Sequence, residues 1–379
     1  MKLSDICDVY SGYAFKTFND LGHGVPVIKI SNLLPDGSID LINCLFTTEN
    51  IKEKFYSKKS DIYIALSGAT TGKISIMDKD NTFAINQRVG IVRNRSTISN
   101  EYLKYFLMSR SNRILEEASG CAQPNISPKQ IANYDVPIYS DAVMNKIVSE
   151  LREIDKIKNT YQKQLELLDE LVKARFVEMF GDPIENQKDW EVVKIRDIVT
   201  DVRYGTSKPA VEGGRYPYLR MNNLTVDGGL DLSDLKYIDI PDNEIEKCVV
   251  RKGDILFNRT NSIDLIGKTA VFNLLDDMVI AGYIIRIRLN NQILPDVFSQ
   301  YMNLEAMKKV LRGMAKGAVN QANINAQELQ SIKVYIPDME LQKQYVEFKE
   351  EIDKSRSRIQ KSLEASQELF DSLMQEYFG

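Results

Sequence analysis

The most constraining feature of this sequence is a long internal repeat. Residues 135–181 align with residues 333–379 at a constant offset of 198 residues, without a gap. Upstream the match persists with small gaps. A fixed period of this kind predicts one structural unit that occurs twice in the chain, in the order domain, helix, domain, helix. Matched positions include Val136 and Val334, Ile154 and Ile352, Leu165 and Leu363, and Phe180 and Phe378, together with 2–6 against 194–198 and 30–33 against 221–224.

Each copy ends in a stretch with the spacing of a coiled coil. Apolar residues alternate by three and four, and neither stretch contains Pro or Gly before its terminal Phe-Gly. About 40 residues at roughly 1.5 Å each would form a helix about 60 Å long. The predicted helices span 141–181 and 338–379. Their apolar positions are Val143, Ile147, Ile154, Ile157, Tyr161, Leu165 and Leu168, and Leu341, Tyr345, Phe348, Ile352, Ile359, Leu363 and Leu373.

We expect these two helices to pair with each other. Polar residues such as Glu150 and Ser355 interrupt the seams, so that each helix alone would be marginal. Pairing within one chain removes the concentration penalty, and copies related by a two-fold axis would run antiparallel, with a globular domain at either end. The alternative is two amphipathic helices that lie separately on their own domains. The predicted pairing residues are Ile147, Ile154, Tyr161, Leu165, Tyr345, Ile352, Ile359 and Leu363.

The regions before the helices, 1–140 and 182–337, have the mixed pattern of α/β domains. Each has short apolar runs and then a stretch with helical spacing, at 100–117 and 297–311. Ser127 and Asn325 are predicted helix N-caps, with Pro128 at a first helical position. The predicted fold is therefore mixed α/β, with two such domains separated by two long helices in an antiparallel intramolecular coiled coil, as a pseudo-two-fold repeat. The predicted strands are 26–31, 61–67, 73–77 and 89–92, and 216–221, 254–258, 268–272 and 283–289.

Composition excludes several classes of protein. Of 379 residues, 43% are hydrophobic and 27% are charged, as in ordinary globular proteins. No run approaches the roughly 20 apolar residues of a membrane helix, and no signal-like segment begins the chain, so we expect a cytoplasmic protein. The four cysteines lack a CxxC spacing and are predicted to be reduced and mostly buried; the single histidine, His23, cannot form a histidine-rich metal site, and no metal is expected. A net charge of −4 neither supports nor excludes DNA binding, because a basic face can be local.

No motif in the sequence predicts catalysis. The segment 267–269, Gly-Lys-Thr, is similar to the end of a phosphate-binding P-loop, but Ser262 stands where the motif requires its first glycine. A predicted strand follows, where a P-loop has a helix. The equivalent Gly72-Lys73 fails in the same way, because Ser67 occupies the upstream position. We therefore expect a non-catalytic chain, and a nucleotide-dependent enzyme built on 267–269 is the catalytic alternative.

The layout as a whole resembles the specificity subunits of type I restriction-modification systems, the HsdS family. That family alternates two variable α/β domains with two similar long helices, and the resemblance covers the full length of this chain. The local marks are 190–195 at the start of the second domain, 64–69 followed by Gly72-Lys73, 86–88 and 120–127, with partial repeats at Gly317 and 323–325.

The resemblance implies a non-catalytic DNA-recognition subunit. Each domain would read one half of a bipartite target in double-stranded DNA, while the helices set the spacing and dock methyltransferase subunits. Two methyltransferase (M) subunits with S-adenosylmethionine would bind, one at each half, and ATP-driven restriction (R) subunits would join them. S-adenosylmethionine, ATP and Mg²⁺ are thus expected on partner subunits, and no cofactor in this chain. A coiled-coil adaptor that binds protein without reading DNA is the alternative.

Base recognition would fall to polar side chains on loops above the sheets. Arg and Lys suit guanine, Asn and Gln suit adenine, and Lys, Ser and Thr also contact phosphate. For any one residue, a solvated loop position is the alternative. The predicted DNA-binding residues are Ser11, Tyr13, Lys16, Ser67, Thr70, Thr71, Lys73, Gln87, Arg88, Gln123 and Asn125 in the first domain, and Tyr204, Thr206, Lys208, Arg259, Asn261, Lys268, Asn320, Gln321 and Asn323 in the second.

Overall fold

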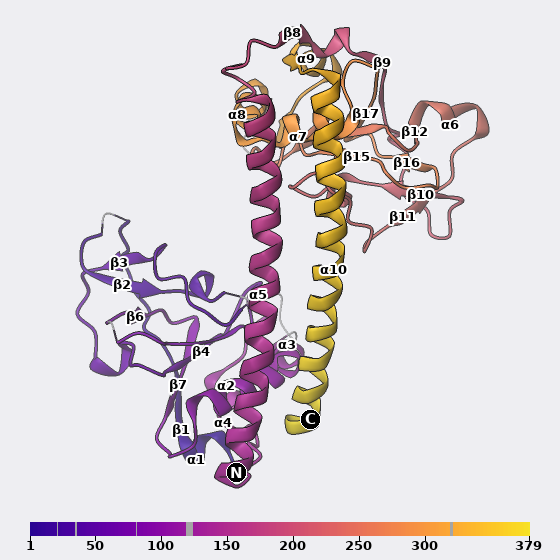
Figure 1. Ribbon diagram of the computed structural model, residues 1–379. Helices are drawn as coiled ribbons and strands as arrows, with labels where there is room; N and C mark the ends of the chain where they lie inside the picture. Colours follow the sequence, from indigo (N-terminus) through magenta and orange to yellow (C-terminus); the bar gives the residue numbers. More distant parts are fainter. Residues whose placement is uncertain (21, 35, 81, 119–123, 319–320) are drawn as a thin grey trace. The chain divides into compact units, whose positions relative to one another are not determined.

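The computed structural model describes the chain except residues 21, 35, 81, 119–123 and 319–320, and the side chains of 316–318 and 321 also lie outside the description. The chain divides into two compact units, Met1–Lys163 with Gln360–Gly379, and Gln164–Ile359. Each unit contains an α/β domain together with parts of both long helices (Figure 1). The mixed α/β fold predicted from the repeat is confirmed.

The two long helices are α5 (Asp141–Phe180) and α10 (Met339–Phe378), each of 40 residues. After α5 comes Gly181, whose φ of +85° is the left-handed conformation that glycine commonly supplies after a helix. In the first unit, Tyr377 near the end of α10 donates a hydrogen bond to Glu150 near the start of α5. In the second unit, Tyr345 near the start of α10 stacks edge-on against Phe176 near the end of α5, with ring centroids 5.4 Å apart. The predicted antiparallel pairing is therefore confirmed.

The seam of this helix pair differs in part from the prediction. In the first unit α5 buries Met144, Ile147, Leu151 and Ile154, a spacing of three, four and three residues. Val143 and Ile157 were predicted on the seam wrongly, since they are 43% and 40% exposed; the true pattern begins one residue after Val143. Among the predicted pairing residues, Ile147, Ile154 and Tyr345 are buried, and Tyr161, Leu165, Ile352, Ile359 and Leu363 are half-buried.

The first domain is built on two sheets that share one core. The main sheet is antiparallel, with the order β1-β7-β4-β5, and a smaller sheet has the order β3-β2-β6. Alternate residues of β4 face opposite sides, because side chains alternate along a strand: Ile62 and Ile64 pack under the helices, and Tyr63 and Ala65 pack against the smaller sheet. The strands are β1 (Cys7–Ser11), β2 (Val25–Ile28), β3 (Leu45–Thr47), β4 (Ile62–Ala65), β5 (Ile74–Ile76), β6 (Ala84–Ile85) and β7 (Val89–Asn94).

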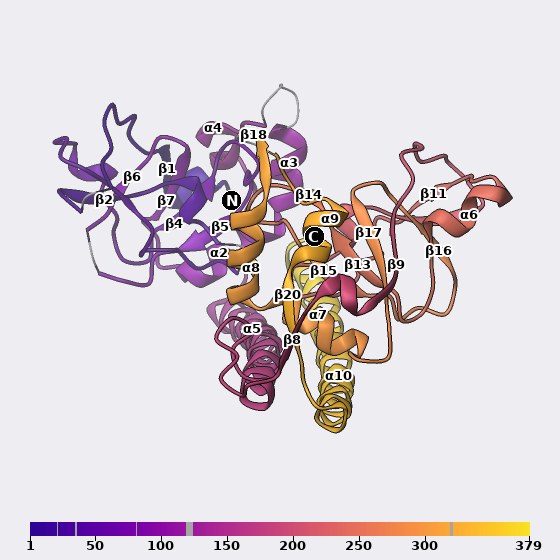
Figure 2. The same cartoon turned by 90° about the horizontal axis from the view of Figure 1, so that it is seen from above.

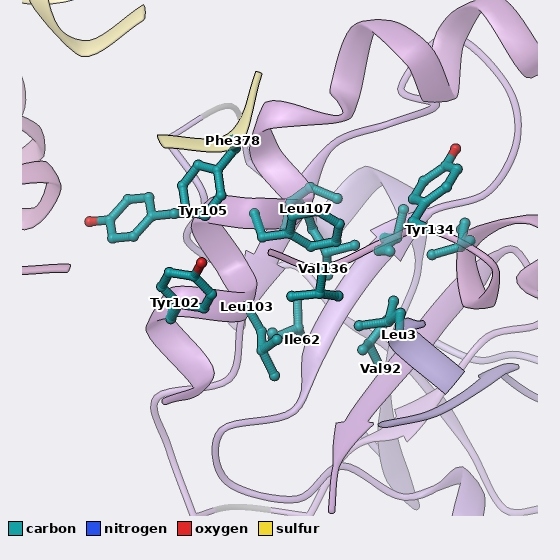
Figure 3. Close-up of a cluster of buried hydrophobic side chains, with 14 of the residues drawn as sticks. Leu3, Ile62, Val92, Tyr102, Leu103, Tyr105, Leu107, Tyr134, Val136 and Phe378 are labelled. Atoms are coloured by element: carbon teal, nitrogen blue, oxygen red, sulfur yellow. The ribbon is translucent and has the colours of Figure 1, made fainter. Parts of the chain in front are cut away.

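Helices cover the other face of the main sheet. Both long helices, α5 and α10, contribute side chains to the core on this face. Phe378, in the last turn of α10, packs on Tyr102 and Phe106 with ring centroids 5.3 and 6.2 Å apart. Figure 3 shows this cluster, in which Ile62 of the sheet lies beside Leu103, Val92 lies beside Leu3, and Phe378 lies near Tyr105. The end of the chain is therefore part of the first domain. The shorter helices are α1 (Leu3–Ile6), α2 (Asn100–Ser109), α3 (Ser111–Ala118) and α4 (Pro128–Ala132).

The second domain repeats this topology, with one further strand, β12, in its smaller sheet. Its main sheet has the order β9-β17-β13-β15, and its smaller sheet has the order β11-β10-β16-β12. The parallel pair β2 and β6 has its counterpart in β10 and β16. The strands are β9 (Val199–Tyr204), β10 (Tyr216–Leu219), β11 (Lys236–Ile238), β12 (Val249–Val250), β13 (Ile255–Asn258), β15 (Thr269–Val271), β16 (Met278–Ile280) and β17 (Ile284–Leu289).

Two further strand pairings are longer in the second domain than at the equivalent places of the first, where isolated β-bridges join Lys2 to Asp135 and Ser67 to Asn125. A small sheet forms from β14 (Thr260–Asn261), β18 (Lys316–Ala318) and β19 (Gln321–Asn323), and β8 (Glu191–Lys194) pairs with β20 (Lys333–Ile336). Helix α7 lies between the main sheet and α10 (Figure 2), where its Asp296 pairs with Lys349 at 3.0 Å. The helices of this domain are α6 (Asp242–Cys248), α7 (Pro295–Asn303), α8 (Glu305–Met314) and α9 (Ala326–Ser331).

The predicted strands each overlap an observed strand, but the single helix expected in each domain is two helices. The first breaks at Arg110, between α2 and α3, and the second breaks at Leu304, whose extended backbone separates α7 from α8. Apolar spacing continues across both breaks, so periodicity could not reveal them. The N-cap predictions are confirmed: Ser127 accepts a hydrogen bond from the N–H of Gln130, and Asn325 accepts from Gln327 and Glu328.

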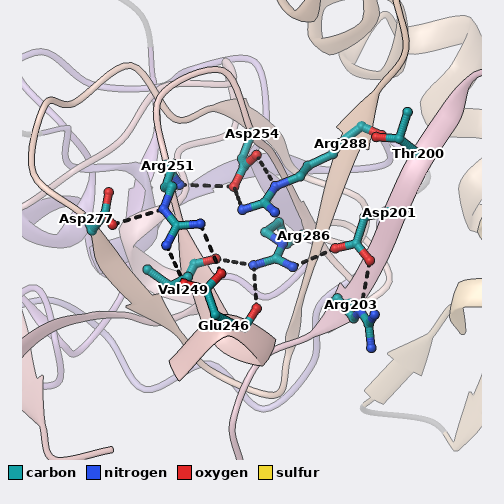
Figure 4. A network of polar contacts seen from close by, with 10 residues as sticks. All are labelled: Thr200, Asp201, Arg203, Glu246, Val249, Arg251, Asp254, Asp277, Arg286 and Arg288. Atoms are coloured by element: carbon teal, nitrogen blue, oxygen red, sulfur yellow. Dashed lines mark hydrogen bonds and ion pairs between the residues drawn. The ribbon is translucent and has the colours of Figure 1, made fainter. Parts of the chain in front are cut away.

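A buried ion pair recurs at the same place in both main sheets. In the first domain Arg93 binds Asp61 through two hydrogen bonds, of 2.8 and 2.6 Å. In the second, Arg288 binds Asp254 through bonds of 2.9 and 3.3 Å (Figure 4). Both aspartates are nearly fully buried, so the paired arginine is what makes their burial tolerable. The recurrence shows that the repeat extends into the polar interior of the domains.

Two further expectations concern solvent exposure and the membrane. Cys7, Cys44 and Cys248 are free and buried, as predicted, and burial raises the pKa of the Cys7 thiol to about 12; Cys121 lies outside the described residues. Over the part of the chain that the structure describes, no helix combines the length and the apolar character needed to cross a membrane.

Candidate nucleic-acid interface

Polar turns from four separate parts of the first domain meet at one edge of its main sheet. Because neighbouring strands are antiparallel, β1 and β4 end at the edge where β7 and β5 begin. The N–H of Gln87 donates to the carbonyl of Tyr13 at 2.8 Å, and the N–H of Leu66 donates to the carbonyl of Arg88 at 2.9 Å. Ser67 forms a β-bridge with Asn125. The structure therefore brings together residues predicted from distant loops.

We call this group of residues the first polar edge. Gln87, Arg88 and Asn125 are exposed on it, whereas the other members are half-buried. It consists of Ser11, Tyr13, Ser67, Thr70, Lys73, Gln87, Arg88 and Asn125.

The second domain has an equivalent edge, formed by the ends of β9 and β13 and the starts of β17 and β15. Here the N–H of Arg259 donates to the carbonyl of Tyr283 at 3.0 Å, and the N–H of Gly282 donates to the carbonyl of Thr206 at 2.8 Å. The hydroxyl of Thr260 donates to the side-chain oxygen of Asn323 at 2.9 Å. We call Tyr204, Thr206, Arg259, Asn261, Tyr283 and Asn323 the second polar edge; Tyr283, which is 51% exposed, was not among the predicted residues.

The backbone hydrogen bonds of the two edges correspond one to one. The bond from Leu66 to Arg88 is matched by the bond from Arg259 to Tyr283. Gly12 and Gly205 hold equivalent positions after the first strand, where a Cβ would lie 2.3 Å and 2.2 Å from the carbonyl oxygens of Ile85 and Ile280. No side chain fits in such a space, so glycine at both positions lets the main sheet join the smaller one. The two polar edges therefore have the same backbone geometry but different side chains.

Arg259 is held in a defined orientation on the second polar edge. Its guanidinium lies over the ring of Tyr204, 5.0 Å from the centroid, and Nη1 is 3.4 Å from the carbonyl oxygen of Gly282. The Tyr204 hydroxyl in turn accepts a hydrogen bond of 2.8 Å from the N–H of Ala326, at the start of α9. Nε of Arg259 is buried and has no hydrogen-bond partner among the described residues. Nη2, which has no hydrogen-bond partner among the described residues, and the weakly engaged Nη1 remain available to a ligand.

Two predicted DNA-binding side chains are used inside the protein. The ammonium of Lys268 is buried and donates to the carbonyls of Met221 and Leu224, at 2.7 and 2.5 Å, and burial lowers its pKa. Thr71 is buried and donates to the carbonyl of Gly68 at 2.7 Å. The prediction that Lys268 and Thr71 lie at a DNA surface is therefore corrected, because their polar atoms already have hydrogen-bond partners within the fold. The same geometry removes the P-loop alternative, since Lys268 cannot reach a phosphate and β15 follows it.

Five other predicted residues are not members of the two edges, because their polar groups are engaged elsewhere or lie outside the description. The backbone N–H of Lys16 donates to Glu49 at 2.7 Å, and Lys208 forms an ion pair of 2.9 Å with Glu244. Gln123 and Asn320 lie outside the described residues, as does the side chain of Gln321. The N–H of Lys208 also donates to the hydroxyl of Thr206 at 3.2 Å, so Lys208 borders the second polar edge.

An aromatic and basic surface beside the first polar edge was missed. Tyr13 contacts Phe15 and Phe55 with ring centroids 5.1 and 5.6 Å apart, and Lys54 lies 4.8 Å from the centroid of Phe55. Phe18, which is 39% exposed, lies under Lys29. Aromatic rings beside cations are typical of nucleic-acid surfaces. The signal was the basic and aromatic run at 52–59, Lys-Glu-Lys-Phe-Tyr-Ser-Lys-Lys.

The described residues offer no evident reactive group. Lys308 has a pKa lowered to about 7 by burial, but its ammonium donates to the carbonyl of Gly267 and to the side chain of Asn303, so that it ties α8 to the main sheet. Among the described residues, no group of three or more His, Cys, Asp or Glu side chains could hold a metal ion. What the edges do offer is hydrogen-bond donors and acceptors on fixed turns, which suits recognition.

Comparison with known proteins agrees with this geometry. The family model described as type I restriction modification DNA specificity domain matches residues 1–168 and again residues 187–367. The EcoKI specificity subunit of Escherichia coli K12, a type I restriction enzyme, is 22% identical over 362 residues, 89% of this chain and 77% of that protein. The putative MjaX specificity subunit of Methanocaldococcus jannaschii is 31% identical over 198 residues, 51% of this chain and 46% of that one.

Solved structures share the fold. The S subunit of the type I restriction-modification system from M. genitalium superimposes with a TM-score of 0.54 at 16% identity, covering 100% of this chain and 95% of that one. A chain from a structure of type I system assembly and conformational transition gives a TM-score of 0.55 at 15% identity, with 100% and 96% covered. Both likenesses extend over the full repeat of domain and helix.

Proposed function

This chain belongs to the type I restriction-modification DNA specificity family, and on that premise we propose that its two domains read the two halves of a bipartite DNA target. It is a DNA sequence-specificity subunit of a type I restriction-modification system, as its relatives are.

One observation supports two separate DNA-reading domains. The two polar edges have equivalent backbone hydrogen bonds but carry different side chains. Equivalent positions carry Ser11 and Tyr204, Leu66 and Arg259, or Arg88 and Tyr283. Different side chains on one frame are what two different half-sites require, because base edges are told apart by donor and acceptor patterns.

The DNA contacts that we propose are the members of the first and second polar edges. Exposed Gln87, Arg88 and Asn125, with Arg259 and Asn261, can meet base edges. The hydroxyls and Lys73 suit phosphate, which positions the protein without specifying sequence. Lys54, beside the half-buried ring of Phe55, and Lys29, beside the exposed ring of Phe18, extend the positive surface of the first domain.

The helices α5 and α10 would act as the spacer between the readers. On this proposal the readers are 1–140 and 182–337, the helices set the distance between half-sites, and their outer faces dock two methyltransferase subunits, which restriction subunits then join. Exposed apolar residues on those faces, such as Leu167, Leu171 and Leu369, fit a docking role. The chain itself would be non-catalytic and would work in the cytoplasm, with S-adenosylmethionine, ATP and Mg²⁺ bound by its partners.

Methylome sequencing tests this function directly. Cells without other methylation that express the full chain with its methyltransferase subunit are expected to carry adenine methylation at a split motif, in which two short specified halves flank unspecified bases. The methyltransferase expressed alone is the control and should give no such motif. A continuous motif, or methylation without sequence preference, would contradict the two-reader proposal and favour a protein-binding adaptor.

A further inference from the structure

Each polar edge carries an arginine that has no ion-pair partner among the described residues. In the first domain it is Arg88, which is exposed; in the second it is Arg259, which rests on Tyr204. Other arginines of these domains are engaged: Arg93, Arg95, Arg203, Arg220 and Arg288, for example, all pair with aspartates. A paired arginine must give up its carboxylate before it can bind DNA. Arg88 and Arg259 are free of that cost.

The two arginines lie at opposite ends of a backbone hydrogen bond that is equivalent in the two domains. Arg88 provides the carbonyl that accepts the N–H of Leu66, and Arg259 provides the N–H that donates to the carbonyl of Tyr283. Since these two backbone bonds are equivalent in the repeat, Arg259 stands where the first domain has Leu66, and Arg88 stands where the second has Tyr283. Each domain therefore has, at this backbone hydrogen bond, one arginine without an ion-pair partner among the described residues. In the first domain it is the residue that accepts the bond, and in the second it is the residue that donates it.

The setting of Arg259 is that of a pre-formed reader of a planar target. Stacking on Tyr204 restricts the guanidinium plane, and the hydrogen bond from Ala326 to the Tyr204 hydroxyl fixes the ring. Nε is buried and cannot reach a base, but Nη2 has no hydrogen-bond partner among the described residues and Nη1 is only weakly engaged, 3.4 Å from its acceptor, so these two nitrogens can both donate to a ligand. Binding costs less when the side chain is already ordered. The base edge that matches two parallel N–H donors is guanine, through O6 and N7.

We infer that Arg88 and Arg259 each read one guanine, one in each half of the target. This rests on the proposed function and specifies which side chain sets one base in each half. A lysine or hydroxyl contact to phosphate would weaken binding to every sequence alike, whereas a bidentate arginine contact sets the choice of base at one position.

The test compares methylomes of cells that express the methyltransferase with the wild-type chain, with Arg259→Ala or with Arg88→Ala. Each substitution is expected to relax one G·C position in one half of the motif, with roughly 5- to 150-fold loss of discrimination there, and the two substitutions should act on different halves. The unaffected half and the spacing serve as internal evidence that the complex is assembled. Arg196→Ala, which removes an exposed arginine just before β9 begins, at the opposite end of that strand, is the matched control and should leave the motif unchanged.

If an alanine variant yields no methylation, Arg259→Leu and Arg88→Tyr decide the matter, because each introduces the residue found at the equivalent position of the other domain. A split wild-type motif that stays intact in the variants, or that is methylated less at all sites equally, would overturn the arginine assignment while leaving two-domain reading in place. A wild-type motif that is not split would refute the proposed function itself.

Discussion

Replacing Arg286 with alanine is expected to lower the free energy of unfolding of the second unit by about 3–5 kcal/mol, as is typical when one partner of a buried ion pair is removed. Arg286 is 1% exposed; its Nη2 donates to Asp201 at 2.6 Å, and Nη1 donates to the carbonyls of Val249 and Glu246 (Figure 4). The substitution leaves those acceptors without their donor. Urea titration followed by the fluorescence of Trp190, the single tryptophan, reports on this unit.

Arg203→Ala is the matched control, because Arg203 binds the same carboxylate at 2.8 Å from an exposed position. Exposed ion pairs contribute about 0–1 kcal/mol, so this variant should unfold close to the wild type. Equal destabilisation by both variants would contradict the assignment of the effect to the buried arginine.

Acid should reduce the difference between the wild type and Arg286→Ala. Burial alone would raise the pKa of Asp201, but hydrogen bonds from Arg203 and Arg286 outweigh it and lower the pKa below its usual value. A carboxyl with a lowered folded-state pKa stabilises the fold above its unfolded pKa of about 3.9, and that stabilisation is lost as the pH falls through the folded value. The wild type should therefore lose more stability than the variant below about pH 4.

Phe176→Ala is expected to destabilise the second unit by about 3–5 kcal/mol, the usual cost of emptying a buried phenylalanine site. Phe176 is fully buried, and its ring centroid lies 4.9 Å from Phe180, 5.4 Å from Tyr345 and 6.4 Å from Tyr301. These rings come from α5, α10 and α7, so the cavity would open where the helix pair meets the domain. Trp190 fluorescence in urea measures the loss.

Two further variants separate ring packing from other causes. Val177→Ala changes the next residue of α5, which is 40% exposed, and should alter the unfolding free energy by no more than about 0.5 kcal/mol. Tyr345→Phe removes a buried hydroxyl that has no hydrogen-bond partner among the described residues, so it should be neutral or stabilising. A large loss for Tyr345→Phe would show that the hydroxyl, and not the ring, carries the contact.

The long helices could be predicted almost to the residue because they are both periodic and repeated. The expected 141–181 and 338–379 correspond to α5 and α10, and Gly181 ends the first as a glycine after a helix should. Some of the shorter strands could not be predicted from the sequence. Strands β1 and β9 have mostly half-exposed side chains, since they lie at sheet edges, and therefore lack a clear alternation of apolar and polar residues.

The sequence predicts which loops carry the candidate site, but it does not predict that these loops meet at one edge of each sheet. The sequence marks Arg88 and Arg259 as polar residues near predicted strands, whereas their equivalent backbone bonds depend on strand pairing across the sheet. Lys268 could not be assigned from sequence, because the carbonyls that hold its ammonium belong to residues 221 and 224, distant in the chain. Tyr283 opens the predicted strand 283–289, so the sequence assigns it to the sheet and not to a loop.

The most direct test of two independent readers is to exchange residues 1–140 for the first domain of another family member and to sequence the resulting methylome. The account predicts a motif in which one half is new, while the other half and the number of unspecified bases between them stay as in the wild type. A hybrid that changes both halves would contradict it.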